Sequence, residues 1–195
     1  MRLAIFGGTF DPIHLGHVQA ALAAADACSL DRVLVVPSGS PPHKSGASKA
    51  PYEHRFRMVE LSCAADPRLE ASRLEEPQEG GGPHYTIRTV DRVRSTTSFE
   101  DPLRLIIGAD AFADVGTWYA AEEVVAKVEF LVVARPGWEA VPTGLTTAPK
   151  ARIIECFHPA SSSLIRHRVK IGGSLADLAP SAVSAYIWEH CLYQI

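Results

Sequence analysis

The sequence predicts an α/β protein with a doubly wound, mainly parallel sheet that is covered by helices on both faces. Short apolar runs of strand length alternate with helical patterns along the chain, and this alternation is typical of parallel sheets. The length of 195 residues suits one compact domain. Glycines follow the first apolar run, where open α/β sheets bind their ligands. We therefore expect a Rossmann-like arrangement in a single domain, residues 1–195, with a helical C-terminal part over about residues 161–195.

The pattern of apolar residues locates the individual elements. Strands are expected at Leu3–Phe6, Val33–Val36, Leu103–Ile107, Phe130–Ala134 and Ile153–Cys156. Helices are expected at Leu15–Cys28, Tyr52–Ala64, Thr86–Arg94 and Ala121–Lys127, after Ser161–Ser163, and over the tail Leu175–Tyr193. Two polar stretches rich in glycine and proline, Pro37–Pro51 and Glu75–Pro83, are expected to be loops at the site edge of the sheet.

Composition excludes several classes of function. The hydrophobic fraction of 47% and the net charge of −3 are those of an ordinary globular protein without a basic field for nucleic acid. No apolar run approaches the length of about eighteen residues that spans a membrane, and the first residues lack the build of a signal peptide, so we expect a cytoplasmic protein. The four cysteines are widely separated, which predicts reduced thiols and no zinc site.

The stretch from Gly7 to His17 predicts a phosphate site. Gly7 and Gly8 carry no Cβ, so the backbone there can approach an anion closely. His14 and His17 follow at the start of a helix, three residues apart, and can donate to one polyphosphate beside unpaired backbone N–H groups. The glycines could also form a simple turn, and the histidines could be half of a metal site. No Glu lies between the histidines as in the metalloprotease helix motif, and no cysteine cluster lies nearby. The glycine spacing does not match the dinucleotide fingerprint.

The sequence of this stretch, G-G-T-F-D-P-I-H-L-G-H, resembles the signature of the nucleotidyltransferase superfamily with the H-x-G-H motif. Within it, the whole chain resembles the bacterial nicotinate-nucleotide adenylyltransferases. The resemblance implies one nucleotidyltransferase domain that transfers the adenylyl group of ATP to nicotinate mononucleotide, giving deamido-NAD and pyrophosphate. Magnesium would enter with ATP and be held mainly by phosphates and water rather than by protein ligands. The attacking phosphate is already largely ionised, so no general base is expected.

The resemblance also implies an ATP site. Its residues are Gly7, Gly8, Thr9, Phe10, His14, His17, Gly108, Asp110, Ser161, Ser162, Ser163, Ile165 and Arg166. His14 and His17 are the expected catalytic residues, acting on the triphosphate, while the helix start at Ser161–Ser163 and Arg166 would hold the departing pyrophosphate. Judged without the resemblance, this helix start could equally be a serine cap followed by a solvent-exposed arginine.

A second set of residues is implied for nicotinate mononucleotide. It comprises Lys44, Tyr85, Thr86, Trp118, Tyr119 and Arg135. Trp118 would stack on the pyridine ring, Thr86 and nearby N–H groups would bind its carboxylate, and Lys44 and Arg135 would bind the attacking phosphate. By residue type alone, Lys44 could be a surface lysine and Trp118 could be core. Ser38 and Gly39 stand where the family often has asparagine, which leaves their role open.

Other interpretations are a pantetheine-phosphate adenylyltransferase, a cytidylyltransferase, or a nucleotide sensor without catalytic activity. The intact histidines argue against a sensor. Arg55 and Met58 resemble an R-x-x-M stretch of the family, but a surface helix explains them equally well, and we leave them outside the expected site. The preference between the acid and amide forms of the pyridine, and whether the chain is a monomer or a homo-oligomer, stay open.

Overall fold

The computed structural model describes residues 1–39, 49–78, 82–96, 102–138 and 142–194. Its centre is a six-stranded sheet in which every neighbouring pair is parallel and the strand order is β3-β2-β1-β4-β5-β6. The strands are β1 Leu3–Gly8, β2 Arg32–Pro37, β3 Leu69–Ala71, β4 Leu103–Gly108, β5 Val128–Ala134 and β6 Ala151–Glu155. The order reverses between β1 and β4, which is the point where doubly wound sheets bind ligands. The predicted fold class is therefore confirmed.

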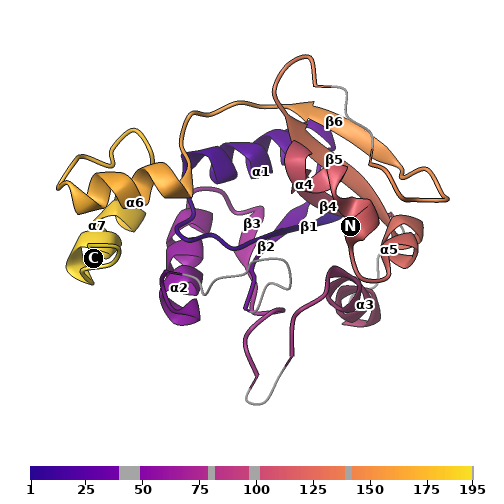
Figure 1. Cartoon of the computed structure of the whole chain (residues 1–195), viewed down its shortest axis with the longest axis horizontal. Coiled ribbons are helices and arrows are strands. Elements are labelled where there is room, and N and C mark those ends of the chain that lie inside the picture. Colours follow the sequence, from indigo (N-terminus) through magenta and orange to yellow (C-terminus); the bar gives the residue numbers. More distant parts are fainter. Residues whose placement is uncertain (40–48, 79–81, 97–101, 139–141, 195) are drawn as a thin grey trace.

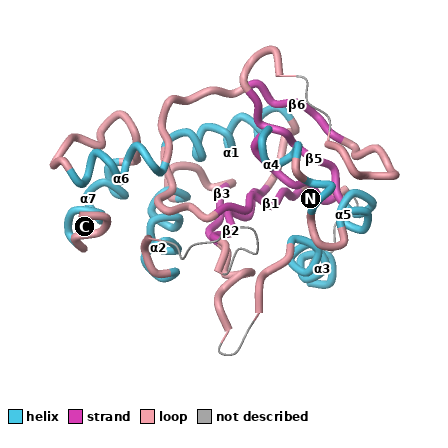
Figure 2. The backbone as a smooth tube through the Cα atoms, viewed as in Figure 1, coloured by secondary structure: helices cyan, strands magenta, loops and turns pink. Residues whose placement is uncertain are grey.

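Helices cover both faces of this sheet (Figure 1, Figure 2). They are α1 Leu15–Ala27, α2 Tyr52–Cys63, α3 Thr86–Thr96, α4 Ala109–Ala113, α5 Ala121–Lys127, α6 Ser162–Lys170 and α7 Ser181–Glu189, with a 3₁₀ turn at Val115–Thr117. Alternate β1 residues face opposite sides, so Phe6 packs in one hydrophobic cluster and Ile5 in the other. The first cluster includes residues of α1, α2, α6 and α7, and the second includes residues of α3 and α5.

The structure differs from the sequence prediction in four places. β3 was not predicted, because an edge strand of three residues with one buried side chain gives no periodic signal. The five-residue helix α4 was missed for the same reason of length. β1 continues through Gly7 and Gly8, which pair with Val36 and Pro37 of β2 and have no positive φ. The glycine pair is therefore strand rather than turn.

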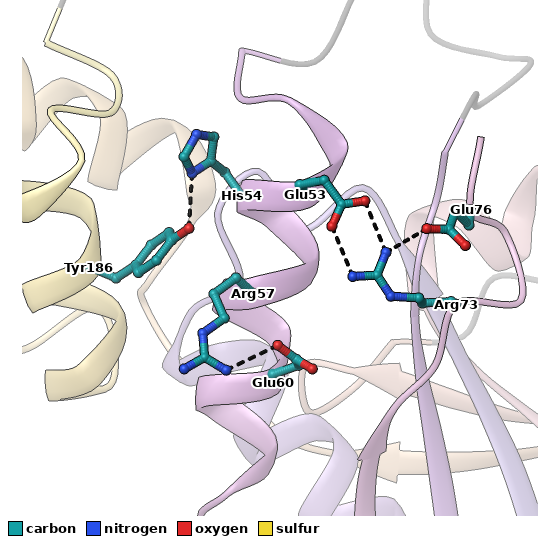
Figure 3. Close-up of polar contacts among 7 residues, drawn as sticks. All are labelled: Glu53, His54, Arg57, Glu60, Arg73, Glu76 and Tyr186. Carbon is teal, nitrogen blue, oxygen red and sulfur yellow. Dashed lines mark hydrogen bonds and ion pairs between the residues drawn. The ribbon is translucent and has the colours of Figure 1, made fainter. Parts of the chain in front are cut away.

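The terminal helix is also shorter than predicted. It covers Ser181–Glu189 instead of 175–193, because Pro180 fixes its start and the chain leaves the helix at His190. α7 packs against α2, where the hydroxyl of Tyr186 and the Nδ1 of His54 are hydrogen-bonded at 3.0 Å (Figure 3). Beyond α7, the hydroxyl of Tyr193 donates to the carboxylate of Asp11 at 2.8 Å. The C-terminal segment thus reaches back to the loop that follows β1. Within the described residues, no helix has both the length and the apolarity needed to cross a bilayer.

Candidate active site

Two cavities open at the carboxyl ends of the central strands β1 and β4. The larger, about 990 Å³, is lined by His14 and His17, and we call it the histidine cavity. The smaller, about 520 Å³, is lined by Tyr85, Trp118 and Tyr119, and we call it the aromatic cavity. Both are also lined by Gly7, Gly8, Asp110 and Ala111. The end of β1 and the start of α4 therefore form the boundary where the two cavities meet.

His14 and His17 cap α1 reciprocally. His14 is the N-cap residue, and its Nδ1 accepts a hydrogen bond from the backbone N–H of His17 at 3.3 Å. The Nδ1 of His17 accepts from the backbone N–H of His14 at 3.2 Å, and the two rings stack with their centroids 3.6 Å apart. Because each Nδ1 accepts a hydrogen bond, the N–H that each ring can offer to a ligand is on Nε2. The predicted placement of both imidazoles on one side of the helix start is confirmed.

The burial of His14 determines its charge state. Burial, and to a lesser degree the neighbouring His158, lowers the pKa of His14 to about 4. The ring is 8% exposed and is therefore neutral at pH 7, so it offers a hydrogen-bond donor rather than a positive charge. His158 also lines the histidine cavity and was missed by the sequence analysis. Its Nδ1 accepts from the backbone N–H of Ala160 at 3.0 Å, just before the start of α6.

Gly8 and Phe10 fix the ring of His17. A side chain at Gly8 would meet the Phe10 ring at 2.8 Å, whereas one at Gly7 would point into open space. Phe10 has a positive φ of 47° and is buried, and its ring meets that of His17 edge-on at 5.0 Å. Gly8 is therefore required by this packing, while Gly7 leaves room for a ligand at the strand end.

Arg55 stabilises the loop after β1 through hydrogen bonds from its guanidinium. Its side chain is 2% exposed, and its guanidinium donates to the carbonyls of Thr9 and Ser38 at 2.8 Å and of Ala50 at 3.2 Å. The interpretation of Arg55 as a surface residue is wrong, because this side chain points from α2 into the space between the loops that follow β1 and β2. The R-x-x-M resemblance was the signal that could have identified it.

Ser38 and Gly39 connect the loop after β2 with the segment after β3. A side chain at Gly39 would collide with the main-chain oxygen of Glu75, so this close approach requires glycine. Ser38 lines the aromatic cavity, and its carbonyl accepts from Arg55. The departure from the family pattern at these two positions is therefore compatible with a tightly packed cavity wall.

The start of α6 is tied to the loop after β1. Ser161 caps the helix by accepting from the N–H of Leu164 at 3.2 Å, and Ser162 donates to the carbonyl of Pro12 at 2.8 Å. Arg166 donates to the carbonyl of Asp11 at 2.6 Å and lines a separate hollow of about 360 Å³ with Lys49 and Lys170.

Six of the predicted ATP residues do not line the histidine cavity: Thr9, Ser161, Ser162, Ser163, Ile165 and Arg166. Ser162 and Arg166 bond to the main chain of the loop after β1, and Ile165 is fully buried in the core. The main-chain N–H of Ile165 donates to the carbonyl of Ser161 at 3.1 Å within the helix. Ser163 lies beside the cap, with its Oγ 3.2 Å from that of Ser161.

The aromatic cavity brings together four of the predicted mononucleotide residues. The rings of Tyr85 and Tyr119 lie 4.5 Å apart, and Trp118 and Thr86 line the same space. Trp118 also packs against the hydrophobic cluster of α3 and α5. Both interpretations of this tryptophan are therefore compatible with its position, since one part of it contacts core and another part faces the cavity.

Arg135 lies apart from the other predicted mononucleotide residues. It follows β5 and lines the histidine cavity, where its guanidinium stacks over Phe157 at 4.7 Å from the ring centroid. Gly108, at the end of β4, lines the same cavity, and Asp110 lies at the boundary of the two cavities. Lys44 lies outside the described residues, as do Pro41, Pro42 and His43.

Comparison with known proteins gives one consistent result. Residues 5–168 match the family described as cytidylyltransferase-like. A probable nicotinate-nucleotide adenylyltransferase of Solibacter usitatus is 47% identical, over 99% of this chain and 100% of its own length. A probable nicotinate-nucleotide adenylyltransferase of Thermus thermophilus is 43% identical over 100% of both chains. Among solved structures, the nicotinic acid mononucleotide adenylyltransferase of Plasmodium falciparum complexed with NaAD has the same fold, with a TM-score of 0.78, 18% identity, and coverage of 98% of this chain and 97% of that one.

Proposed function

The chain belongs to the cytidylyltransferase-like family, in its nicotinate-nucleotide adenylyltransferase branch, and on this premise we propose what its site does. The enzyme transfers the adenylyl group of ATP to nicotinate mononucleotide, giving deamido-NAD and pyrophosphate. The reaction joins two nucleotides at one phosphorus atom. The observation that carries the proposal is the meeting of two cavities at Gly7, Gly8 and Asp110, beside the stacked histidines.

ATP would occupy the histidine cavity. Its phosphates would lie against the start of α1, where backbone N–H groups and the helix dipole favour negative charge. The Nε2–H groups of His14 and His17 would donate to phosphate oxygens as charge moves onto the leaving pyrophosphate. Such fixed donors stabilise developing charge more than they stabilise the ground state. Arg135, which follows β5 and lines this cavity, would contribute a fork of N–H groups to the phosphates.

Nicotinate mononucleotide would occupy the aromatic cavity. The rings of Trp118, Tyr85 and Tyr119 offer flat surfaces for its pyridine, and the start of α3 at Thr86 offers N–H groups for its carboxylate. With its phosphate at the boundary beside Gly7, the attacking oxygen would face the α-phosphorus of ATP. The catalytic contribution of the protein is then alignment and charge stabilisation, without a general base.

The start of α6 would mainly position the loop between β1 and the histidines. Its side chains donate hydrogen bonds to the main-chain carbonyls of Asp11 and Pro12 in this loop. Arg166 and the N–H groups of this helix start would interact with pyrophosphate once ATP is bound. Lys44 keeps its predicted role as a cation for the attacking phosphate.

Magnesium would accompany ATP as part of the substrate. Among the described residues, no group of three or more His, Cys, Asp and Glu side chains is arranged to hold a metal ion. The donors at the cavity boundary are Asp110 and, when ATP is bound, the phosphate oxygens, which are hard ligands that suit this ion. Magnesium there would neutralise part of the triphosphate charge, leaving orientation to the histidines and glycines. We place the whole reaction in the cytoplasm, where ATP is available.

The test supplies the purified protein with ATP and Mg²⁺ and offers each candidate acceptor separately. We expect pyrophosphate release and a dinucleotide of the mass of deamido-NAD with nicotinate mononucleotide. Pantetheine phosphate should give neither product, and CTP should not replace ATP. Turnover with one of those alternatives, or ATP binding without any turnover, would contradict the proposed function.

A further inference from the structure

Among the described residues that line the aromatic cavity, acidic side chains outnumber basic ones. The acidic side chains that line it are Glu75, Asp110 and Asp114. Among the described residues that line it, His84 has the only side chain able to carry a positive charge. Nicotinate mononucleotide would bring two negative groups, a ring carboxylate and a phosphate. A carboxylate entering a cavity of low polarity beside other carboxylates is repelled unless a positive donor faces it.

Glu75 lies close enough to His84 to interact with it. The carboxylate of Glu75 accepts a hydrogen bond from the hydroxyl of Thr89 at 2.7 Å, which fixes it against α3. Burial raises the pKa of the Glu75 carboxyl, while hydrogen bonds from Thr89 and Ser38 and the attraction of His84 act in the opposite direction. The carboxyl group of Glu75 is therefore an electrostatic neighbour of the His84 imidazole.

The hydrogen-bonding capacity of His84 is not consumed by the fold. Its Nδ1 is buried and has no hydrogen-bond partner among the described residues. A buried polar atom without a partner is energetically unfavourable, so such atoms commonly mark places where a ligand or water completes the network. His84 comes directly before Tyr85 and Thr86, so it lies at the end of the cavity where the pyridine substituent would be bound.

We propose that His84, supported by Glu75, selects the acid form of the pyridine mononucleotide over the amide form. This inference rests on the proposed function and adds the determinant of its specificity. The two mononucleotides differ at one group, a carboxylate or a carboxamide of nearly the same shape. A positive charge at His84 attracts the carboxylate and offers much less to the neutral amide. Without that charge, the acidic lining of the cavity disfavours the carboxylate and leaves the amide unaffected.

The experiment measures kcat/KM for nicotinate mononucleotide and for nicotinamide mononucleotide in the same ATP and Mg²⁺ buffer. For His84→Asn, we expect the acid-to-amide ratio to fall about tenfold or more, through a higher KM for the acid, with the KM for ATP unchanged. His84→Lys restores a positive charge and should keep the ratio within about threefold of wild type. The matched control is His167→Asn, which removes an exposed histidine of α6 and should leave the ratio unchanged.

The outcomes separate this inference from the proposed function. Thermal unfolding of each variant confirms that it is folded, and His84→Gln replaces His84→Asn if the latter is not. An unchanged ratio in the folded neutral variant overturns the role of His84. An equal loss of preference in the neutral and lysine variants overturns it too, because the charge would then not be the determinant. If wild-type protein makes no dinucleotide from either mononucleotide, the proposed function itself fails.

Discussion

The two cavities are built in different ways, although they share a boundary. The histidine cavity depends on one continuous stretch, in which β1, its glycines and the cap of α1 fix two imidazoles through main-chain hydrogen bonds. The aromatic cavity is assembled from side chains that follow three different strands. Ser38 follows β2, residues 75 and 84–86 follow β3, and the lining residues within 110–119 follow β4. We infer that the first cavity determines the rate of the chemical step and that the second determines which substrate is used.

Removal of a histidine donor tests the first half of this comparison. His17→Ala should lower kcat by about 10²- to 10³-fold, because one fixed donor to developing charge is lost. The KM values should change much less. Steady-state kinetics together with a thermal unfolding curve would check this result, since the variant also loses half of the reciprocal cap. A folded variant with kcat near that of wild type would remove His17 from the mechanism.

Removal of Arg55 tests whether the two cavities share one support. Arg55→Ala should lower the free energy of unfolding by about 3 kcal/mol, because three carbonyls lose a buried charged donor. It should also raise the KM of both substrates, since both cavity walls would move. Urea unfolding and steady-state kinetics measure the two effects.

A matched control for Arg55 lies on the same helix. Arg57 makes an exposed ion pair with Glu60 at 3.1 Å, and Arg57→Ala should cost less than about 1 kcal/mol (Figure 3). Equal losses of stability in the two variants would show that Arg55 acts only as a generic surface charge. A change in KM for one substrate alone would contradict a shared support.

The pH dependence of stability tests the buried state of His14. Its pKa is about 4 in the folded protein and about 6.5 when exposed, so the unfolded state takes up the proton first as the pH falls. The contribution is complete above pH 6.5 and is lost progressively toward pH 4. The free energy of unfolding should therefore fall by about 2 kcal/mol between pH 7 and pH 5 because of His14.

His14→Asn serves as the reference for that measurement. Asparagine retains a side-chain acceptor at the N-cap but does not titrate in this range. Urea unfolding at several pH values should therefore give a shallower acid dependence for the variant than for wild type. Parallel curves for the two proteins would contradict a buried, neutral His14.

Removal of Trp118 tests the role of the aromatic cavity in substrate choice. It is the prediction with the smallest expected effect. Trp118→Ala should raise the KM for nicotinate mononucleotide about tenfold through loss of a stacking surface, with little change for ATP. Initial rates at varied concentrations of each substrate separate the two KM values. Equal increases for both substrates would mean that Trp118 is core rather than a recognition residue.

The same contrast explains what could be predicted from the sequence. The Gly7–His17 stretch is local, so its chemistry was recognisable from residue types and spacing, although the glycines proved to be strand. The aromatic cavity depends on distant segments, and its residues were identified only through family resemblance. Arg55 was misjudged because the burial and hydrogen-bond partners of a helical arginine depend on packing between elements. The hydrogen bond from Arg166 to the carbonyl of Asp11 could not be predicted for the same reason. His84 and His158 were missed because single histidines carry no pattern.

The most direct test of the account is the crystal structure of the protein with a non-hydrolysable ATP analogue. The Nε2 atoms of His14 and His17 should each lie within about 3.2 Å of phosphate oxygens, with the α-phosphorus beside Gly7 at the boundary of the two cavities. Phosphates bound instead in the hollow between Lys49 and Lys170, with both rings left without contact to the ligand, would contradict it.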